Sequence, residues 1–158
     1  MLLIQRDIQS LGGIASTAEL LRRGHSAEMI WIWSRYGTIV RVRKGWYANA
    51  DVSDDVLRAV RIGGRLACVS AAAHHGLIDS SFPSLHVSVG RHSSRLRSAT
   101  DAKIQLAEHP DPSVVIHWTR LPLDGGRQAV SPEEALRQMR LCSHPDAKAA
   151  IGESAANR

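Results

Sequence analysis

The chain has 158 residues, 44% of them apolar, with a formal net charge of +5 and a pI of about 9.9. This length and composition suit one domain or two small ones with a real core, and they exclude a disordered chain. No apolar run approaches the ~20 residues of a membrane span. Met1 to Ile4 are followed at once by polar residues, which is not a signal peptide, so we expect a cytoplasmic protein with no membrane partner.

The positive charge is concentrated in the first two thirds of the chain. Residues 1–50, 51–100 and 101–158 carry net charges of +4, +2 and −1. This distribution favours a polyanionic partner such as nucleic acid. The two cysteines, Cys68 and Cys142, lie far apart and form no Cys-x-x-Cys pair, which indicates a reduced environment.

Three short helices are predicted at the start of the chain. Apolar residues at positions 3, 4, 8 and 11 lie on one helical face. Ser16 and Glu19 have the spacing of a capping box, so a second helix begins there. Ser26 is the candidate N-cap of a third helix, which runs to about Tyr36. A helix, a short turn and a second helix form the helix-turn-helix layout, in which the third helix here enters the major groove.

A basic hairpin follows these helices. Apolar and basic residues alternate from 39 to 43, Lys44 and Gly45 suit a turn, and the aromatic pair at 46–47 favours a return strand. The solvent side of the hairpin carries Arg41, Arg43 and Lys44. Helices followed by a basic hairpin predict a winged helix-turn-helix over residues 1–55. By itself, the hairpin has an alternative interpretation as an exposed edge that Arg and Lys keep soluble.

The remainder, residues 56–158, is predicted to be a small α/β domain, so the fold class is α+β. We expect a helix that ends at Gly63, a helix capped by Ser70, and helices that begin at Ser131 and after Pro145. Strands are expected at 85–89, 103–107 and 113–119, with Leu85, Val87 and Val89 on one face and His86 and Ser88 on the other. Loops are expected at 90–100 and 121–128.

The patterns of catalytic and metal-binding residues argue against an enzyme. No His-x-x-x-His, Cys-x-x-Cys or His-x-Glu motif is present, and His74 and His75 are adjacent, so we expect no metal and no cofactor. His86 and His117 are interpreted as strand residues satisfied by hydrogen bonds. The triplets at 101–103 and 146–148 imitate a nuclease Asp-x-Lys, but triplets of this kind arise by chance.

The sequence closely resembles the winged-helix domains of the AbiEi-type antitoxins of type IV toxin–antitoxin systems, most of all their actinobacterial branch. The matching segments are residues 13–21 (GIASTAELL), 24–26 (GHS), 37–48 (GTIVRVRKGWYA), 58–71 (RAVRIGGRLACVSA), 76–77 (GL), 85–89 (LHVSV) and 117–118 (HW). The resemblance implies a sequence-specific DNA-binding repressor of its own promoter. It also implies an antitoxin that opposes a nucleotidyltransferase-like toxin without binding it tightly. The second domain would arrange a homodimer or carry the antitoxic function.

The chain departs from that family in two ways. The third helix of relatives is usually rich in Arg, whereas Arg35 is the only cation of this one, so Trp31 or Ile32 has an alternative role in packing on protein or on a second copy. Many relatives also continue beyond the position of Arg158 into a nuclease-like domain. The alternative function is therefore the DNA-targeting half of a nuclease system whose catalytic domain is missing or supplied in trans.

The predicted contacts to double-stranded DNA come from four places. They are the end of the second helix, the third helix, the hairpin and the loop after position 90. The residues are Arg22, Arg23, Ser26, Glu28, Trp31, Ser34, Arg35, Arg41, Arg43, Lys44, Arg91, Arg95 and Arg97.

Overall fold

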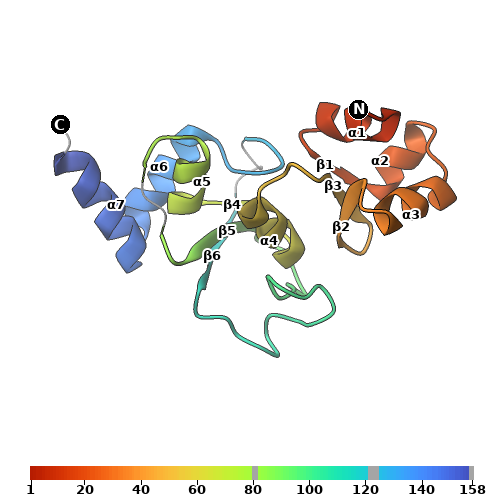
Figure 1. Cartoon of the computed structure of the whole chain (residues 1–158). Helices are drawn as coiled ribbons and strands as arrows, with labels where there is room; N and C mark the ends of the chain where they lie inside the picture. Colours follow the sequence, from red (N-terminus) through yellow and green to blue (C-terminus); the bar gives the residue numbers. More distant parts are fainter. Residues whose placement is uncertain (80–81, 121–124, 157–158) are drawn as a thin grey trace.

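The computed structural model describes residues 1–79, 82–120 and 125–156, and over these residues the protein is a mixed α+β fold with seven helices and two three-stranded sheets. The elements follow one another along an elongated molecule, with the N-terminal helices at one end and the C-terminal helix at the other (Figure 1). None of the helices in this described part is long and apolar enough to cross a membrane.

The N-terminal unit packs three helices against the first sheet. Its elements are α1 (Leu3–Ser10), β1 (Ile14–Ser16), α2 (Thr17–Arg22), α3 (Ala27–Arg35), β2 (Ile39–Arg43) and β3 (Trp46–Asn49). The sheet order is β1-β3-β2, and both pairings are antiparallel. A core inside this unit is formed by Ile4, Ile8, Ala15, Leu20, Ile30 and Ile39.

The helix starts of this unit follow the expected caps. Ser16 Oγ accepts a hydrogen bond from the Glu19 amide, and the Glu19 carboxylate accepts one from the Ser16 amide. Ser26 Oγ accepts from the Met29 amide at the start of α3. These side chains satisfy amides that have no partner inside their own helix, which fixes where α2 and α3 begin.

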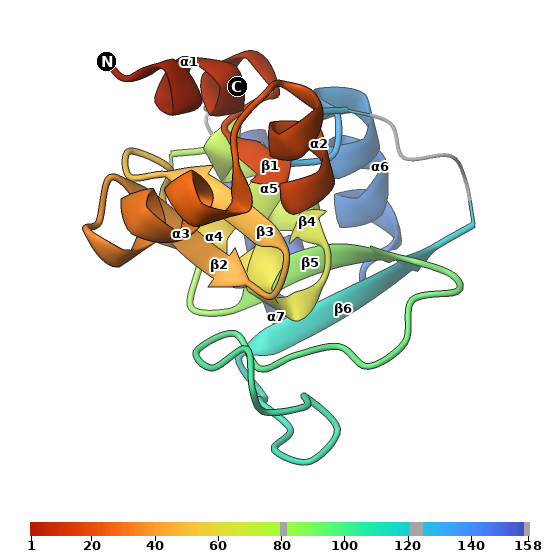
Figure 2. The same ribbon diagram turned by 90° about the vertical axis from the view of Figure 1, so that its right-hand side faces the viewer.

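The second sheet lies in the middle of the molecule. Its strands are β4 (Arg65–Leu66), β5 (Leu85–Gly90) and β6 (Val114–Thr119), in the order β4-β5-β6, with β4 antiparallel and β6 parallel to β5. The helices are α4 (Asp54–Ile62), α5 (Cys68–His74), α6 (Pro132–Leu141) and α7 (Pro145–Ala156). Figure 2 looks onto the N-terminal unit and shows β5 and β6 side by side behind it.

One core joins the two sheets across position 55. Ile14, Val42 and Ala48 of the first sheet are buried together with Val56, Val60 and Val87, among others. The contact is also polar. Arg61 Nε donates to the Val42 carbonyl at 3.3 Å, and Gln128 Nε2 donates to the Gly12 carbonyl at 2.9 Å. The segments 1–55 and 56–158 therefore share a hydrophobic core, and no extended linker separates them.

Several local predictions for the second half were wrong. Ser70 does not cap a helix, because α5 begins at Cys68 after the N-cap Ala67, and Ser70 Oγ instead accepts from the His86 amide. Residues 103–107 form no strand; only Gln105 makes an isolated bridge, to Arg97. The strand predicted at 85–89 is present as β5, and His86 and Ser88 on its second face are buried as well, because the middle strand of the sheet is covered on both faces. Of the loop predicted at 121–128, residues 121–124 lie outside the described residues.

Candidate nucleic-acid interface

The outer face of α3 is exposed and largely uncharged. Ile30 is buried and Trp33 packs on the N-terminal core, whereas Glu28, Trp31 and Arg35 are exposed, and Trp31 is 60% exposed. These three residues follow one another at helical spacing, so they lie on one face. Ser34 Oγ donates to the Trp31 carbonyl at 2.8 Å and is used within its own helix. The helix thus presents an aromatic ring with one charge of each sign beside it.

The hairpin formed by β2 and β3 carries cations on its exposed side. Arg41 and Lys44 are exposed. Gly45 has φ +78°, a backbone conformation that residues with a side chain rarely adopt. The Gly45 carbonyl accepts a hydrogen bond of 2.9 Å from the Thr17 amide at the start of α2. The turn is therefore fastened to the helices at a fixed position.

Arg43 turns away from the exposed edge of the hairpin. An irregularity in the pairing, with Arg41 opposite Tyr47 and Arg43 opposite Trp46, breaks the alternation that the sequence indicates. The Arg43 guanidinium lies 5.6 Å from the centre of the Trp46 ring. Its Nε is buried, with no hydrogen-bond partner among the described residues. Burial, and secondly the charge of Arg97, lower the pKa of Arg43.

The two arginines at the end of α2 differ in their surroundings. Arg22 is exposed. Arg23 Nη1 lies 3.0 Å from Asp7 Oδ1 and 2.7 Å from Ser10 Oγ, and His25 Nε2 lies 2.7 Å from the other oxygen of Asp7. The hydrogen bond to His25 is the main reason why the pKa of Asp7 is lowered. Arg23 thus ties α1 to α2, whereas Arg22 is available to a ligand.

The loop between β5 and β6 comes near the hairpin at Leu96, because a Cβ atom added at Gly63 would lie 3.4 Å from Arg43 Nη1 and 3.5 Å from Leu96 Cδ2. Arg91 and Arg95 are exposed on it. Arg97 is half-buried: its amide donates to the Ile62 carbonyl at 3.0 Å, and its Nη1 lies 3.4 Å from the Lys103 carbonyl. Arg97 of this loop and Arg43 of the hairpin therefore lie close enough for the charge of Arg97 to add to burial in lowering the pKa of Arg43.

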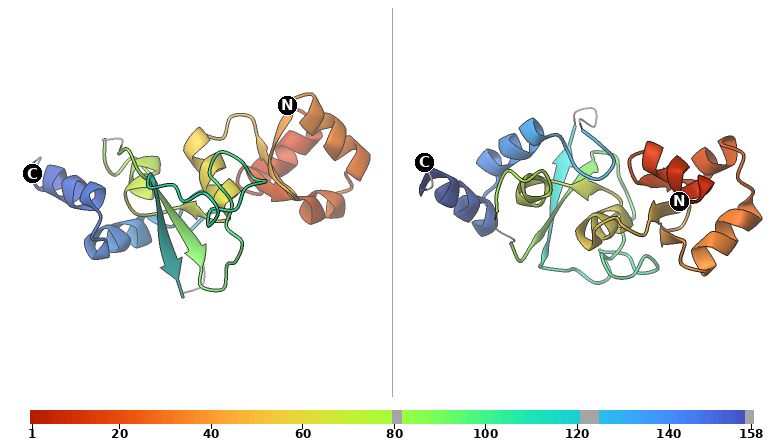
Figure 3. Two further views of the ribbon diagram at one scale, coloured as in Figure 1. Left: turned by 90° about the horizontal axis from the view of Figure 1, so that it is seen from below. Right: turned by 45° about the horizontal axis from the view of Figure 1, so that its top comes forward.

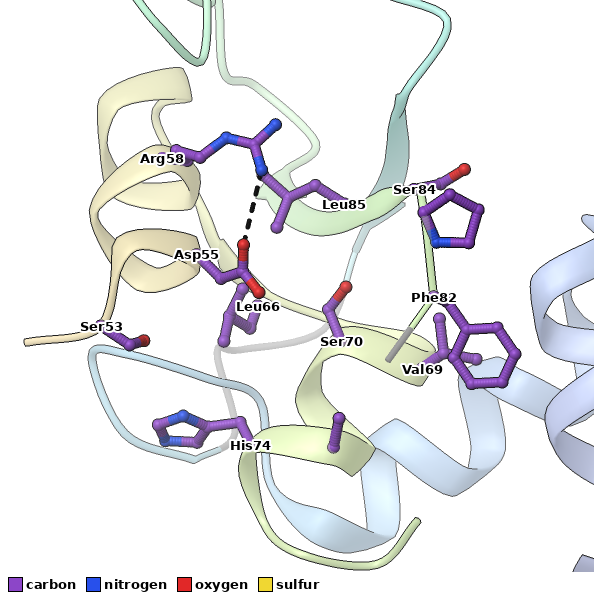
Figure 4. A pocket seen from close by; sticks show the side chains of 12 residues that line it. Ser53, Asp55, Arg58, Leu66, Val69, Ser70, His74, Phe82, Ser84 and Leu85 are labelled. Carbon is purple, nitrogen blue, oxygen red and sulfur yellow. Dashed lines mark hydrogen bonds and ion pairs between the residues drawn. The ribbon is translucent and has the colours of Figure 1, made fainter. Parts of the chain in front are cut away.

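Two cavities lie beside the second sheet, and the larger one borders the candidate interface. The larger, of about 700 Å³, lies between the N-terminal unit and the second sheet, and four arginines line it: Arg22, Arg43, Arg65 and Arg127. A smaller one of about 310 Å³ lies between α4 and α5 (Figure 4). In it Arg58 Nη1 and Asp55 Oδ1 are 3.4 Å apart, so these two charges balance each other.

A second group of side chains that could bind a ligand lies in the other half of the molecule. Cys68, His86, His117 and Cys142 each offer a ligand atom, and these atoms all lie within 4.8 Å of one another. Burial, and next the neighbouring Cys142, raise the pKa of Cys68 to about 12, while burial lowers the pKa of His86 to about 4. No short sequence motif contains this group, because its members are separated by 18, 31 and 25 positions.

Comparisons with known proteins add no assignment. No protein-family model matches the chain, and a search of the curated proteins found no match.

Proposed function

We propose that the protein is a cytoplasmic, non-enzymatic repressor of transcription that binds double-stranded DNA through a winged helix-turn-helix in residues 1–55. The observation that carries this proposal is the order helix, strand, helix, helix, strand, strand with sheet order β1-β3-β2. In this proposal the exposed α3 is the recognition helix, and the exposed cations Arg41 and Lys44 belong to the wing.

The two parts of the interface have different tasks in this proposal. Arg41, Lys44 and Arg22 neutralise phosphates, and Arg91 and Arg95 extend the contact along the backbone, which supplies affinity without sequence preference. The α3 residues Trp31 and Arg35 meet base edges, where apolar groups contact the thymine methyl group and Arg pairs with guanine. Because α3 carries only one cation, most of the affinity comes from outside this helix.

The biological setting is proposed from the resemblance of residues 37–48 and of the other matching segments to AbiEi-type antitoxins. In that setting the protein represses its own promoter and opposes a nucleotidyltransferase-like toxin without binding it tightly. A homodimer would place two α3 helices on the two halves of a palindromic operator.

Fluorescence anisotropy tests the proposal. The full chain is titrated into its own upstream DNA and into a scrambled duplex of equal length, across a series of salt concentrations. We expect tighter binding to the upstream DNA at every salt concentration, by a factor of about 10³ or more at physiological salt. Equal, weak and steeply salt-dependent binding to both duplexes would reduce the interaction to charge attraction and overturn the repressor assignment.

A further inference from the structure

The Cys68, His86, His117 and Cys142 cluster joins four separate segments. Cys68 is the first residue of α5, His86 and His117 lie on β5 and β6, and Cys142 directly follows α6. The cluster borders a small apolar core that contains Ala72, Met139 and Ala147. Figure 3 shows α6 and α7 at the opposite end of the molecule from α3, and all four segments of the cluster belong to the part of the chain after α4. The proposed DNA-binding face contributes no residue to it.

We propose that these four side chains bind one Zn²⁺ ion in a closed, tetrahedral Cys₂His₂ site that holds the second sheet and the last helices together. Thiolate sulfur and imidazole nitrogen are the ligands that structural zinc uses. Ideal Zn–S and Zn–N bonds of about 2.3 and 2.0–2.1 Å place the ligand atoms of a tetrahedron about 3.3–3.8 Å apart. Here the atoms lie within 4.8 Å of one another, and His86 Nδ1 and His117 Nε2 are 3.0 Å apart. Small side-chain shifts therefore close the site around an ion.

The charge of the site suits its burial. His86 is fully buried and Cys68 is buried, so an unpaired charge there would be costly. Two thiolates and two neutral imidazoles cancel the charge of a divalent zinc ion, so the complex adds no net charge to the apolar core. Without the ion, a thiolate at Cys68 would be disfavoured by burial, and the negative charge of Asp146 nearby would add to that cost.

The second nitrogen of His86 completes the argument for zinc. When Nδ1 binds a metal, the proton of the ring must sit on Nε2. This Nε2 is buried without a hydrogen-bond partner among the described residues, and it lies 3.9 Å from Asp146 Oδ2. A carboxylate behind a metal-bound histidine is a common arrangement, since it fixes the orientation of the ring. Asp146 is thus assigned as a positioning residue.

Cys68 is also held in place from outside the site. Its φ is +49°, which is uncommon for a residue other than glycine. Its amide donates a hydrogen bond of 2.9 Å to Gln138 Oε1, from the helix that leads to Cys142. Gln138 therefore connects the two cysteine segments. The ion would add to this by holding β6, which within the described residues is an edge strand of the sheet, paired with β5.

The first experiment measures metal in the full chain. Protein purified under reducing conditions without added chelator is analysed for zinc, and we expect one zinc per chain. After removal of zinc, titration with Co²⁺ should give the intense visible absorption of a tetrahedral thiolate site, saturating at one equivalent. Since binding energy at such a site is folding energy, removal of the ion should lower Tm by on the order of 10 °C.

Two substitutions of histidine separate ligands from neighbours. His117→Asn should abolish binding of Co²⁺. His144→Asn is the matched control, because the His144 ring lies 5.1 Å from the His86 ring and both histidines lie near the carboxylate of Asp146. Under the proposal His144→Asn keeps one equivalent of cobalt with an unchanged spectrum. Asp146→Asn should keep the stoichiometry but weaken zinc binding about 10–100-fold.

Other outcomes overturn the proposal. If the purified wild-type chain holds no zinc, and after reduction takes up no Co²⁺ or Zn²⁺ and gains no thermal stability from either, the cluster is not a metal site. Recovery of a Cys68–Cys142 disulfide together with that result would assign the pair to redox chemistry. These measurements use the wild-type chain, so a His117→Asn variant that fails to fold does not weaken the test. The metal content and the metal uptake are also measured without DNA, so they do not depend on the proposed DNA binding.

Discussion

Arg127 and Glu19 form a two-armed ion pair across 108 positions of sequence: Arg127 Nη1 lies 2.8 Å from Glu19 Oε2, and Nη2 contacts Oε1. Arg127 Nη1 also donates to the Ile14 carbonyl at 3.0 Å. The same carboxylate caps α2 through the Ser16 amide. One arginine from the second half of the chain therefore holds both β1 and the start of α2, and so helps to fix the N-terminal unit on the rest of the protein.

The stability of this contact should depend on acid. The hydrogen bond from Arg127 is the main reason why the pKa of Glu19 is lowered from 4.5 to about 2. A lowered pKa means that the charged group stabilises the folded state above about pH 4.5, and that this contribution is lost as the pH falls towards 2. We expect the wild type to lose about 1–2 kcal/mol more than Glu19→Gln over this window, since one third of the Arg127 side chain is exposed and solvent weakens the pair.

Urea denaturation of both proteins between about pH 6 and pH 2.5 measures this difference. Glu19→Gln keeps an acceptor for the capping hydrogen bond and removes only the charge. Glu133→Gln, which changes an exposed carboxylate in the first turn of α6, is the matched control and should follow the wild type. If Glu19→Gln shows the same acid sensitivity as the wild type, the ion pair contributes nothing to stability.

A second prediction concerns the close approach of Gly64 to β5. A Cβ atom at Gly64 would contact the Ser88 carbonyl oxygen and the side chains of Val87 and Val89. Because a backbone atom is the obstacle, the strand must move, and we expect Gly64→Ala to lower the free energy of unfolding by at least about 2 kcal/mol. Gly126→Ala, where nothing lies within 4 Å of the added atom, should change it by less than about 0.5 kcal/mol. If urea denaturation gives the same change in free energy for Gly64→Ala and Gly126→Ala, β5 accommodates the added Cβ atom at Gly64 at no cost in stability.

Local signals in the sequence predicted most helices. The caps Ser16, Ser26 and Ser131 act on amides three positions ahead, so the sequence alone contains the whole interaction. The hairpin was predicted for the same reason. The strands β1 and β4 were missed, because three and two residues are too few to show a period of two. Their strand character comes from pairing with β3 and β5, which is a property of the tertiary structure.

The candidate sites were harder to predict than the elements. Strict alternation places Arg41 and Arg43 on one side of the hairpin, and only the shift in register between them turns Arg43 towards Trp46. The cluster of Cys68, His86, His117 and Cys142 depends on the parallel pairing of β5 with β6 and on the packing of α5 against α6. No spacing rule in the sequence contains that information, because each ligand comes from a different element.

The two wing cations should control affinity without controlling sequence preference. We predict that Arg41→Ala combined with Lys44→Ala weakens binding to upstream and scrambled DNA alike, because both side chains are exposed and are proposed to contact phosphates. The slope of log K against log salt should become less steep by up to about 2 units. The double variant Arg140→Ala with Lys148→Ala removes the same charge from exposed positions on α6 and α7 and serves as the control.

Arg43→Ala should behave differently from those wing variants. Its side chain covers Trp46 and is half-buried, so the substitution should lower stability by about 1 kcal/mol while leaving the salt slope nearly unchanged. Anisotropy titrations and urea denaturation of the same preparations separate the two effects. For the wing prediction, the salt slope of the Arg140→Ala and Lys148→Ala control is decisive. If it becomes less steep by the same amount as that of the wing variant, only net charge matters and the wing loses its assigned role.

Trp31 tests whether α3 reads DNA or meets protein. The residue is 60% exposed, so Trp31→Ala should change the free energy of unfolding by less than about 0.5 kcal/mol. If α3 enters the major groove, the variant loses its preference for upstream over scrambled DNA by about 1–3 kcal/mol, while its weak binding to the scrambled duplex is kept. Trp118→Ala, which removes a ring of similar exposure (57%) on β6, is the control and should keep that preference. Unchanged DNA preference together with an altered sedimentation profile would place Trp31 in a protein contact instead, and the reading of bases would then have to come from the wing and its neighbouring loop.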